Sequence, residues 1–133
     1  MLQFEILLFK HILYLYSYTA QAQSAKFTNE IREVRIREGM KAKFEATYAG
    51  NPRPEFTWLF NGKDLPENEH FRIKIKDFSV SLTIYDATMD LSGYYKCVAK
   101  NDLGSDNTMA SLTVNSKSTC IITLKGNVEN QVQ

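Results

Sequence analysis

The residues best suited to metal binding or covalent chemistry are few and far apart in this sequence. Its only cysteines are Cys97 and Cys120, and its only histidines are His11 and His70. A structural zinc site commonly includes a Cys-x-x-Cys pair, and that pair is absent. The histidines lie in unrelated contexts, so we interpret both as structural or surface residues. The sequence therefore indicates no metal site.

Motifs for catalysis are absent as well. The chain contains no G-x-S-x-G, no H-E-x-x-H and no glycine-rich phosphate loop followed by a lysine. Asp64, Glu67 and Glu69 cluster within KDLPENEH, but their spacing is not that of a calcium loop. We interpret this cluster as a solvated loop. We expect a protein that is not an enzyme and that uses no cofactor.

The overall charge is balanced. The 133 residues include 16 basic and 15 acidic side chains, which gives a net charge of +1. This balance provides no general reason to expect a nucleic-acid partner. The hydrophobic share of 44% and the charged share of 23% are typical of a soluble globular domain rather than a disordered chain.

Cys97 lies in the stretch LSGYYKCVAKNDLG, in which two kinds of residue alternate. In an extended strand, Tyr95, Cys97 and Ala99 point to one side, whereas Tyr94 and Lys96 point to the other. Tyr95, Cys97 and Ala99 are typical of residues that line a hydrophobic core. The stretch therefore predicts a strand that lines a hydrophobic core.

Short strands separated by turns fill the chain from residue 26 to about residue 116. Alternating stretches include VRIRE, KAKFEATYAG, EFTWLF, FRIKIK, VSLTIYDA and TMASLTV. The prolines of NPRP and the pair Asn61-Gly62 predict turns between them. The pattern predicts an all-β fold, a two-sheet antiparallel sandwich of about 90 residues, with no convincing helix.

The inward positions of these strands supply a predicted core. In FRIKIK, for example, Phe71, Ile73 and Ile75 are expected to point inward, with basic residues between them pointing outward. The residues that we expect to form the structural core are Phe44, Ala46, Trp58, Leu82, Ile84, Tyr95, Cys97 and Leu112.

Both ends of the chain fall outside the strand pattern. The stretch EILLFKHILYLYSYTA is interrupted by Glu5, Lys10 and His11, so it cannot supply the ~20 apolar residues of a membrane span. We expect residues 1–25 to form a poorly ordered leader. The alternative is a signal-like segment with the small residues AQA at its cleavage site, although Glu5 stands where a positive charge is usual. We expect a folded domain over 26–115 and a weakly ordered tail over 116–133.

Particular residues within 26–115 resemble an immunoglobulin domain of the intermediate set. They are Trp58 on the third strand, Tyr95 two places before Cys97 in SGYYKC, and Gly104 after it. GNPRPEFTWLFNGKDL and SLTIYDATMDLSGYYKCVAKNDLG are similar to stretches of the domains in titin, twitchin, obscurin, palladin and myosin light chain kinase. The resemblance implies an immunoglobulin-like Greek-key sandwich.

The chain departs from this family at a cysteine. The family has a second cysteine about twelve residues before the tryptophan, and Ala46 occupies that position here. Cys97 is therefore expected to be a free, buried thiol, and no inter-sheet disulfide is expected. Cys120 is not a convincing partner because it lies beyond the last strand. A domain without this bridge suits the reducing cytosol.

Two outward faces are candidates for binding other proteins. The resemblance places the second, fourth and fifth strands in one sheet, and basic residues predominate on its outer side. They are Lys41, Lys43, Arg72, Lys74 and Lys76, which we call the basic face. The alternative is a solvated surface that only keeps the domain soluble. On the other sheet, Leu59, Tyr94 and Val98 are expected to point outward and form a weaker candidate.

The resemblance implies a structural and protein-binding module of an intracellular muscle or cytoskeletal protein, or a fragment of one, in the cytoplasm. Expected partners are other proteins, such as neighbouring immunoglobulin domains or actin and myosin filaments; no nucleic acid and no stable membrane span are expected. The alternative is a secreted or cell-surface recognition domain with residues 1–22 as its signal peptide. The absence of an Asn-x-Ser/Thr sequon slightly favours the intracellular interpretation.

Overall fold

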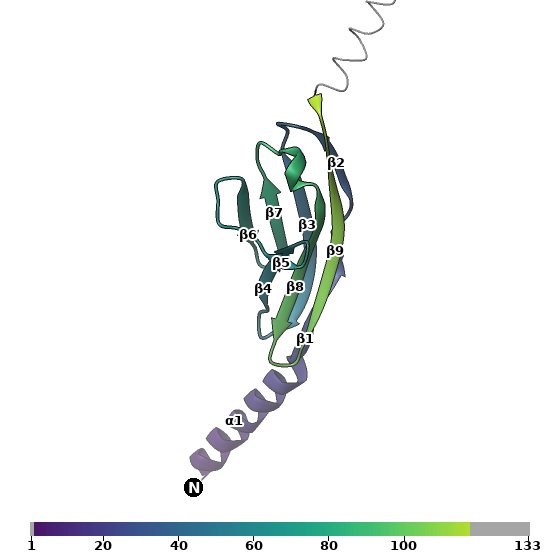
Figure 1. Cartoon of the computed structure of the whole chain (residues 1–133). Helices are drawn as coiled ribbons and strands as arrows, with labels where there is room; N and C mark the ends of the chain where they lie inside the picture. Colours follow the sequence, from purple (N-terminus) through teal and green to yellow (C-terminus); the bar gives the residue numbers. More distant parts are fainter. Residues whose placement is uncertain (1, 118–133) are drawn as a thin grey trace, which may run out of the picture.

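The computed structural model describes residues 2–117, with side chains at all of these positions except 17–20. One helix is followed by a succession of strands (Figure 1). The elements are α1 (Leu2–Gln21), β1 (Gln23–Asn29), β2 (Val34–Arg37), β3 (Ala42–Asn51), β4 (Glu55–Phe60), β5 (Lys63–Asp64), β6 (Phe71–Ile75), β7 (Ser79–Ile84), the 3-10 turn η1 (Met89–Leu91), β8 (Gly93–Asn101) and β9 (Gly104–Asn115). The predicted tail and Cys120 lie outside the described residues, apart from positions 116 and 117.

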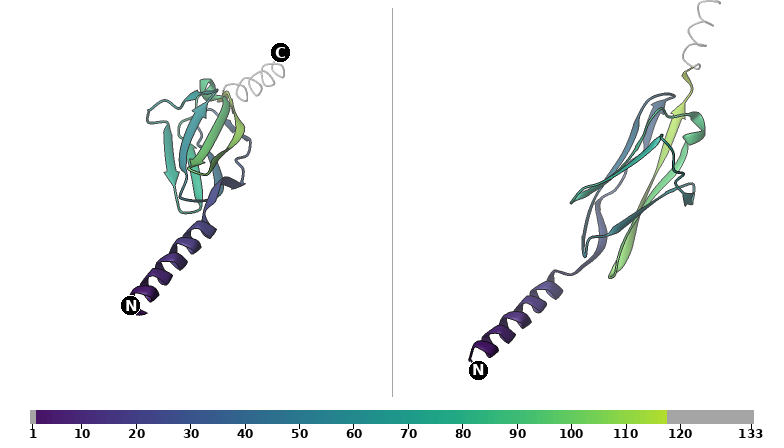
Figure 2. Two further views of the ribbon diagram at one scale, coloured as in Figure 1. Left: turned by 90° about the horizontal axis from the view of Figure 1, so that it is seen from below. Right: turned by 90° about the vertical axis from the view of Figure 1, so that its left-hand side faces the viewer.

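The strands form two sheets that pack face to face, as the right-hand view of Figure 2 shows. The strand order is β1-β3-β7-β6 in the first sheet and β2-β9-β8-β4-β5 in the second. Non-consecutive neighbours give the crossing connections of an immunoglobulin-like sandwich. The predicted two-sheet fold is therefore confirmed. One pair differs from a purely antiparallel arrangement, because β2 runs parallel to β9.

The core fills the space between the inner faces of the two sheets. All eight side chains predicted to form it are buried, and the most exposed of them, Trp58, is only 3% exposed. Trp58 on β4 lies opposite Cys97 on the neighbouring β8, so both point into the core. Ala46 enters the same cluster from β3 in the other sheet.

Tyr95 joins the sheets near one end of the sandwich. Its ring packs against Phe44 at 5.3 Å and against Phe60 at 4.7 Å between ring centroids. Its hydroxyl donates a 2.8 Å hydrogen bond to the backbone oxygen of Leu91, at the end of η1. Burial, together with the charge of Asp90, raises the pKa of Tyr95 above its ordinary value. The phenol therefore stays neutral and keeps its hydrogen bond at physiological pH.

Two residues predicted to point into the core are substantially exposed. Ile73 is 47% exposed and Ile75 is 45% exposed, whereas Phe71 on the same strand is half-buried. β6 is the edge strand of its sheet, and the second sheet ends opposite it in β5, which has only two residues. The second sheet is therefore too narrow to cover the inner face of β6.

Helix α1 is the element that the sequence analysis did not predict. Residues 2–21 contain neither glycine nor proline and are rich in leucine and other helix-forming residues, which explains the helix. The helix points away from the sandwich in both figures, and its large hydrophobic side chains from Leu2 to Tyr16 are exposed. No helix in the described part of the chain is long and apolar enough to span a membrane. The domain limits at 26 and 115 stay a prediction.

Replacing Trp58 with alanine is expected to lower the unfolding free energy by ~3–5 kcal/mol, because it leaves a large cavity in the core. Replacing Tyr95 with phenylalanine keeps the packing and removes only the hydrogen bond to Leu91, so we expect a loss of about 1–3 kcal/mol. Urea unfolding followed by circular dichroism measures both. A Trp58→Ala protein within about 1 kcal/mol of wild type would contradict a core centred on this residue.

Candidate protein-binding face

The five residues of the basic face lie on or directly beside β3 and β6 of the first sheet. The register places Lys43 on β3 opposite Thr83 on β7, and Thr83 opposite Arg72 on β6. Residues paired across neighbouring strands share one face of a sheet. Lys43 and Arg72 therefore lie in one row on the outer face.

A second row lies one residue pair further along the strands. It contains Glu45 on β3, Ser81 on β7 and Lys74 on β6. Ser81 shares the outer face with these residues, yet it is only 6% exposed. Its small side chain lies between the longer side chains of Glu45 and Lys74, which explains the burial. Lys76 directly follows β6, and its side chain is exposed.

Tyr85 connects two of the cations. The Nζ atom of Lys41 and the guanidinium carbon of Arg72 each lie 5.9 Å from the centroid of the Tyr85 ring. A cation above an aromatic ring is stabilised by the ring's electron-rich face. Tyr85 directly follows β7, and its side chain is exposed. Its contact with two charges could not be foreseen, because it depends on the register of three strands.

The basic face carries an excess of positive charge. Lys43 forms an exposed ion pair with Glu45, with 3.1 Å between its Nζ atom and the carboxylate oxygen. No carboxylate of residues 2–117 pairs with Lys41, Arg72, Lys74 or Lys76. Four exposed cations are therefore available to an acidic surface. Because the charges project from a sheet, they suit a broad macromolecular contact better than a small ligand.

The second predicted face is less continuous. Tyr94 is 59% exposed, whereas Leu59 and Val98 are half-buried. Leu59 lies directly opposite Lys96, which stands between Tyr94 and Val98 along the same side of β8. A lysine therefore interrupts this apolar group, and scattered apolar residues of this kind are ordinary on protein surfaces.

The acidic cluster of the sequence does not form a metal centre in the structure. Asp64 belongs to β5, and Glu67 and Glu69 lie in the loop that leads to β6. No group of three or more histidine, cysteine or acidic residues within the described part of the chain is arranged to hold a metal ion.

Cys97 is a free thiol in the middle of the core. Burial raises the pKa of Cys97 from 9.0 to about 12. The neutral thiol is therefore the form present at physiological pH, and it packs as a small hydrophobic group. The residue at the position of the family's second cysteine, Ala46, has no sulfur with which a disulfide could form.

Comparison of the sequence with known proteins identifies relatives of this chain. The sequence model of the immunoglobulin I-set domain matches residues 25–114. Titin of Drosophila melanogaster is 35% identical over 98 residues, which cover 74% of this chain. Smooth muscle myosin light chain kinase of Gallus gallus is 36% identical over 88 residues, which cover 66% of this chain.

The likeness extends to solved structures. The structure of the titin domains Z1Z2 in complex with telethonin superposes with a TM-score of 0.70 and 32% identity, over 72% of this chain and 50% of that chain. The present chain spans only a small part of its curated relatives: 5% of the kinase, and a share of titin that rounds to 0%.

We expect Cys97 to react slowly with a thiol reagent in the folded protein, because the reagent must wait for the core to open. A Cys120→Ser background leaves Cys97 as the only thiol, and the rate in denaturant provides the reference. Reductant should leave the melting temperature unchanged. Rapid native labelling, or a clear fall in melting temperature with reductant, would contradict a buried free thiol.

The raised pKa also predicts a pH dependence of stability. The pKa of Cys97 is higher in the folded state than its ordinary value of 9.0, so the thiol's contribution is fully present below pH 9 and is lost as the pH rises toward about 12. Cys97→Ala should therefore flatten part of the decline in unfolding free energy above pH 9. Denaturant melts at a series of pH values test this, and an unchanged slope would contradict it.

Proposed function

Because this chain belongs to the immunoglobulin I-set domain family, we propose that it acts as a non-enzymatic structural and protein-binding module of an intracellular muscle or cytoskeletal protein. The observation that carries this proposal is the basic face, on which four cations have no carboxylate partner among the described residues. Titin contains a stretch similar to this domain. The chain matches only a small part of the length of each relative, which supports a role as one module among many.

The position of the chain ends supports a load-bearing role. In Figure 1 the chain enters the sandwich at one end through β1 and leaves at the other through β9. The parallel pair β2–β9, which aligns Val34–Arg37 with Leu112–Asn115, lies between these ends. Tension along the chain would pull the two strands past each other. The hydrogen bonds between β2 and β9 would then be loaded in shear, so they would resist the separation of the strands together rather than break one at a time.

The buried thiol supports an intracellular location. Extracellular domains gain stability from disulfides, whereas a reducing compartment makes such a bridge useless. Cys97 has no partner within residues 2–117, and burial keeps its thiol protonated. The core depends on packing alone, which suits a cytoplasmic protein of the sarcomere or cytoskeleton.

We infer that the partner of the basic face is an acidic filament such as actin. The solved relatives include a titin–telethonin complex, in which domains of this fold bind another protein. On the present chain, the basic face has an excess of positive charge, because four of its cations have no carboxylate partner among the described residues. They are Lys41, Arg72, Lys74 and Lys76. Contacts between exposed charges are screened beyond about 8 Å at physiological salt, so such binding would be salt-sensitive.

A secreted or cell-surface domain is the second candidate, and helix α1 is the observation that favours it. Many large apolar side chains of this helix are exposed to water, which is unfavourable unless the segment is removed or covered. Sequencing the amino terminus of the mature protein decides between the two candidates. Cleavage after Ala22 would favour secretion, and an intact amino terminus would favour the intracellular module.

Co-sedimentation with actin filaments tests the basic face. Wild-type protein is expected to pellet with filaments at low salt and to be released as salt rises, because the contact is electrostatic. Changing Lys41, Lys74 and Lys76 to glutamate should abolish most of the pelleting. These side chains are exposed, so the fold should tolerate the change.

The matched control changes Lys26, Lys63 and Lys100 to glutamate. These lysines are also exposed, and the change in net charge is identical, but none belongs to the basic face. Circular dichroism confirms that both variants are folded. Equal pelleting of the two variants would eliminate the basic face as the filament site, and the group Leu59, Tyr94 and Val98 would be the next to test.

A further inference from the structure

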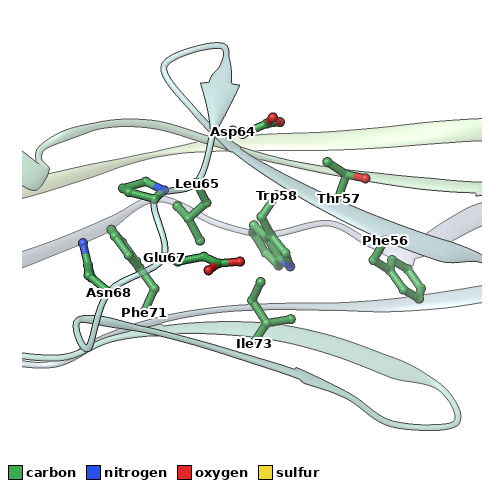
Figure 3. A pocket seen from close by; sticks show the side chains of 10 residues that line it. Phe56, Thr57, Trp58, Asp64, Leu65, Glu67, Asn68, Phe71 and Ile73 are labelled. Carbon is green, nitrogen blue, oxygen red and sulfur yellow. The ribbon is translucent and has the colours of Figure 1, made fainter.

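An apolar groove opens between the edges of the two sheets, on the side formed by β4, β5 and β6 (Figure 3). Its volume is about 460 Å³. Phe56 and Trp58 line it from β4, Phe71 and Ile73 from β6, and Leu65 from the connecting loop. The groove exists because β5 is too short to cover β6. The exposed part of the Ile73 side chain therefore belongs to a concave surface.

The floor of this groove contains a buried donor without an acceptor. The indole Nε1–H of Trp58 has no hydrogen-bond partner in the described structure, although the side chain is only 3% exposed. Figure 3 shows the indole facing into the groove beside Ile73. A buried N–H without an acceptor is destabilising relative to one that has an acceptor. A ligand that places an oxygen here would remove that cost.

Backbone groups at the edge of the groove are also free to bind. β5 pairs only with Leu59 and Phe60, so Glu55, Phe56 and Thr57 have no neighbouring strand on that side within the described residues. β6 is likewise the outer strand of its sheet. An edge strand presents unpaired N–H and C=O groups to which an extended peptide can add.

The charges at the groove specify the chemistry of the ligand. Asp64 and Glu67 both line it and are exposed, and the carboxylate of Glu67 extends over its interior in Figure 3. None of the lining residues is basic. An apolar side chain fits the floor, and a neighbouring cation fits the acidic rim. Arg72 and Lys74 point to the other face of β6 and belong to the basic face.

We propose that this groove binds an extended segment of a partner protein in which an apolar side chain is followed by lysine or arginine. The apolar side chain packs between Trp58 and Ile73. A backbone carbonyl of the segment accepts the hydrogen bond of the Trp58 indole. The cation meets Glu67 and Asp64. This site is separate from the basic face, so it does not depend on filament binding.

The single tryptophan of the chain provides a direct measurement. In a ¹H–¹⁵N spectrum of the 133-residue chain, Trp58 gives the only indole N–H signal. We expect the blocked peptide acetyl-Thr-Val-Leu-Lys-Val-amide to move this signal downfield in a saturable manner, because the indole gains an acceptor. The same peptide with glutamate in place of lysine should bind about fivefold more weakly, as expected for the loss of an exposed ion pair.

Matched variants locate the binding. Glu67→Lys should weaken binding of the lysine peptide about fivefold or more, whereas Glu30→Lys, an exposed change away from the groove, should leave it unaltered. Ile73→Thr should weaken binding, and Ile75→Thr should not. Both isoleucines lie on β6 with similar exposure, but only Ile73 lines the groove.

Three results would overturn the proposal. The first is an indole signal that does not move at saturating peptide concentrations. The second is equal binding of the lysine and glutamate peptides. The third is an indole signal that is already downfield without peptide and returns upfield in Lys125→Glu, because the chain's own carboxyl-terminal residues would then be the occupant. Failure of filament binding has no bearing on any of these outcomes.

Discussion

The two sheets are held together by the packing of their inner faces, and no disulfide joins them within the described residues. Trp58, Cys97 and Ala46 lie at the centre of this contact. A disulfide between positions 46 and 97 would close a loop of about fifty residues, worth roughly 4 kcal/mol in the loop-entropy model. Close packing must supply that stability instead. The ring contacts of Tyr95 and its hydrogen bond to Leu91 extend the packed region toward the end of the sandwich.

Because the inner faces hold the fold, the outer faces and the edges are available for other roles. Alternation along β3 sends one set of side chains into the core and the next set to solvent. Burial of Phe44 and Ala46 thus determines that Lys43 and Glu45 point outward. The register then aligns Lys43 with Arg72 across β7. The basic face is therefore a geometric consequence of a core that must be buried.

The sequence predicts which side of a strand each residue takes, because alternation is a local property. It does not predict whether that side is covered. Ile73 and Ile75 alternate as clearly as Phe44 and Ala46, yet they are exposed because the opposing sheet ends at β5. The same limitation hides the partnerless indole N–H of Trp58, the parallel pairing of β2 with β9, and the contacts of Tyr85 with two cations. Each depends on how separate strands meet.

Strand β6 shows how one edge can serve two surfaces of opposite charge. Its outward residues Arg72 and Lys74 extend the basic face, while Ile73 forms a wall of the groove below Glu67. A wider second sheet would bury Ile73 and close the groove, but it would leave the basic face unchanged. The shortness of β5 therefore determines whether this side of the sandwich is a sealed core or a binding surface. The exposed apolar area and the partnerless indole N–H are the stability cost of keeping it open.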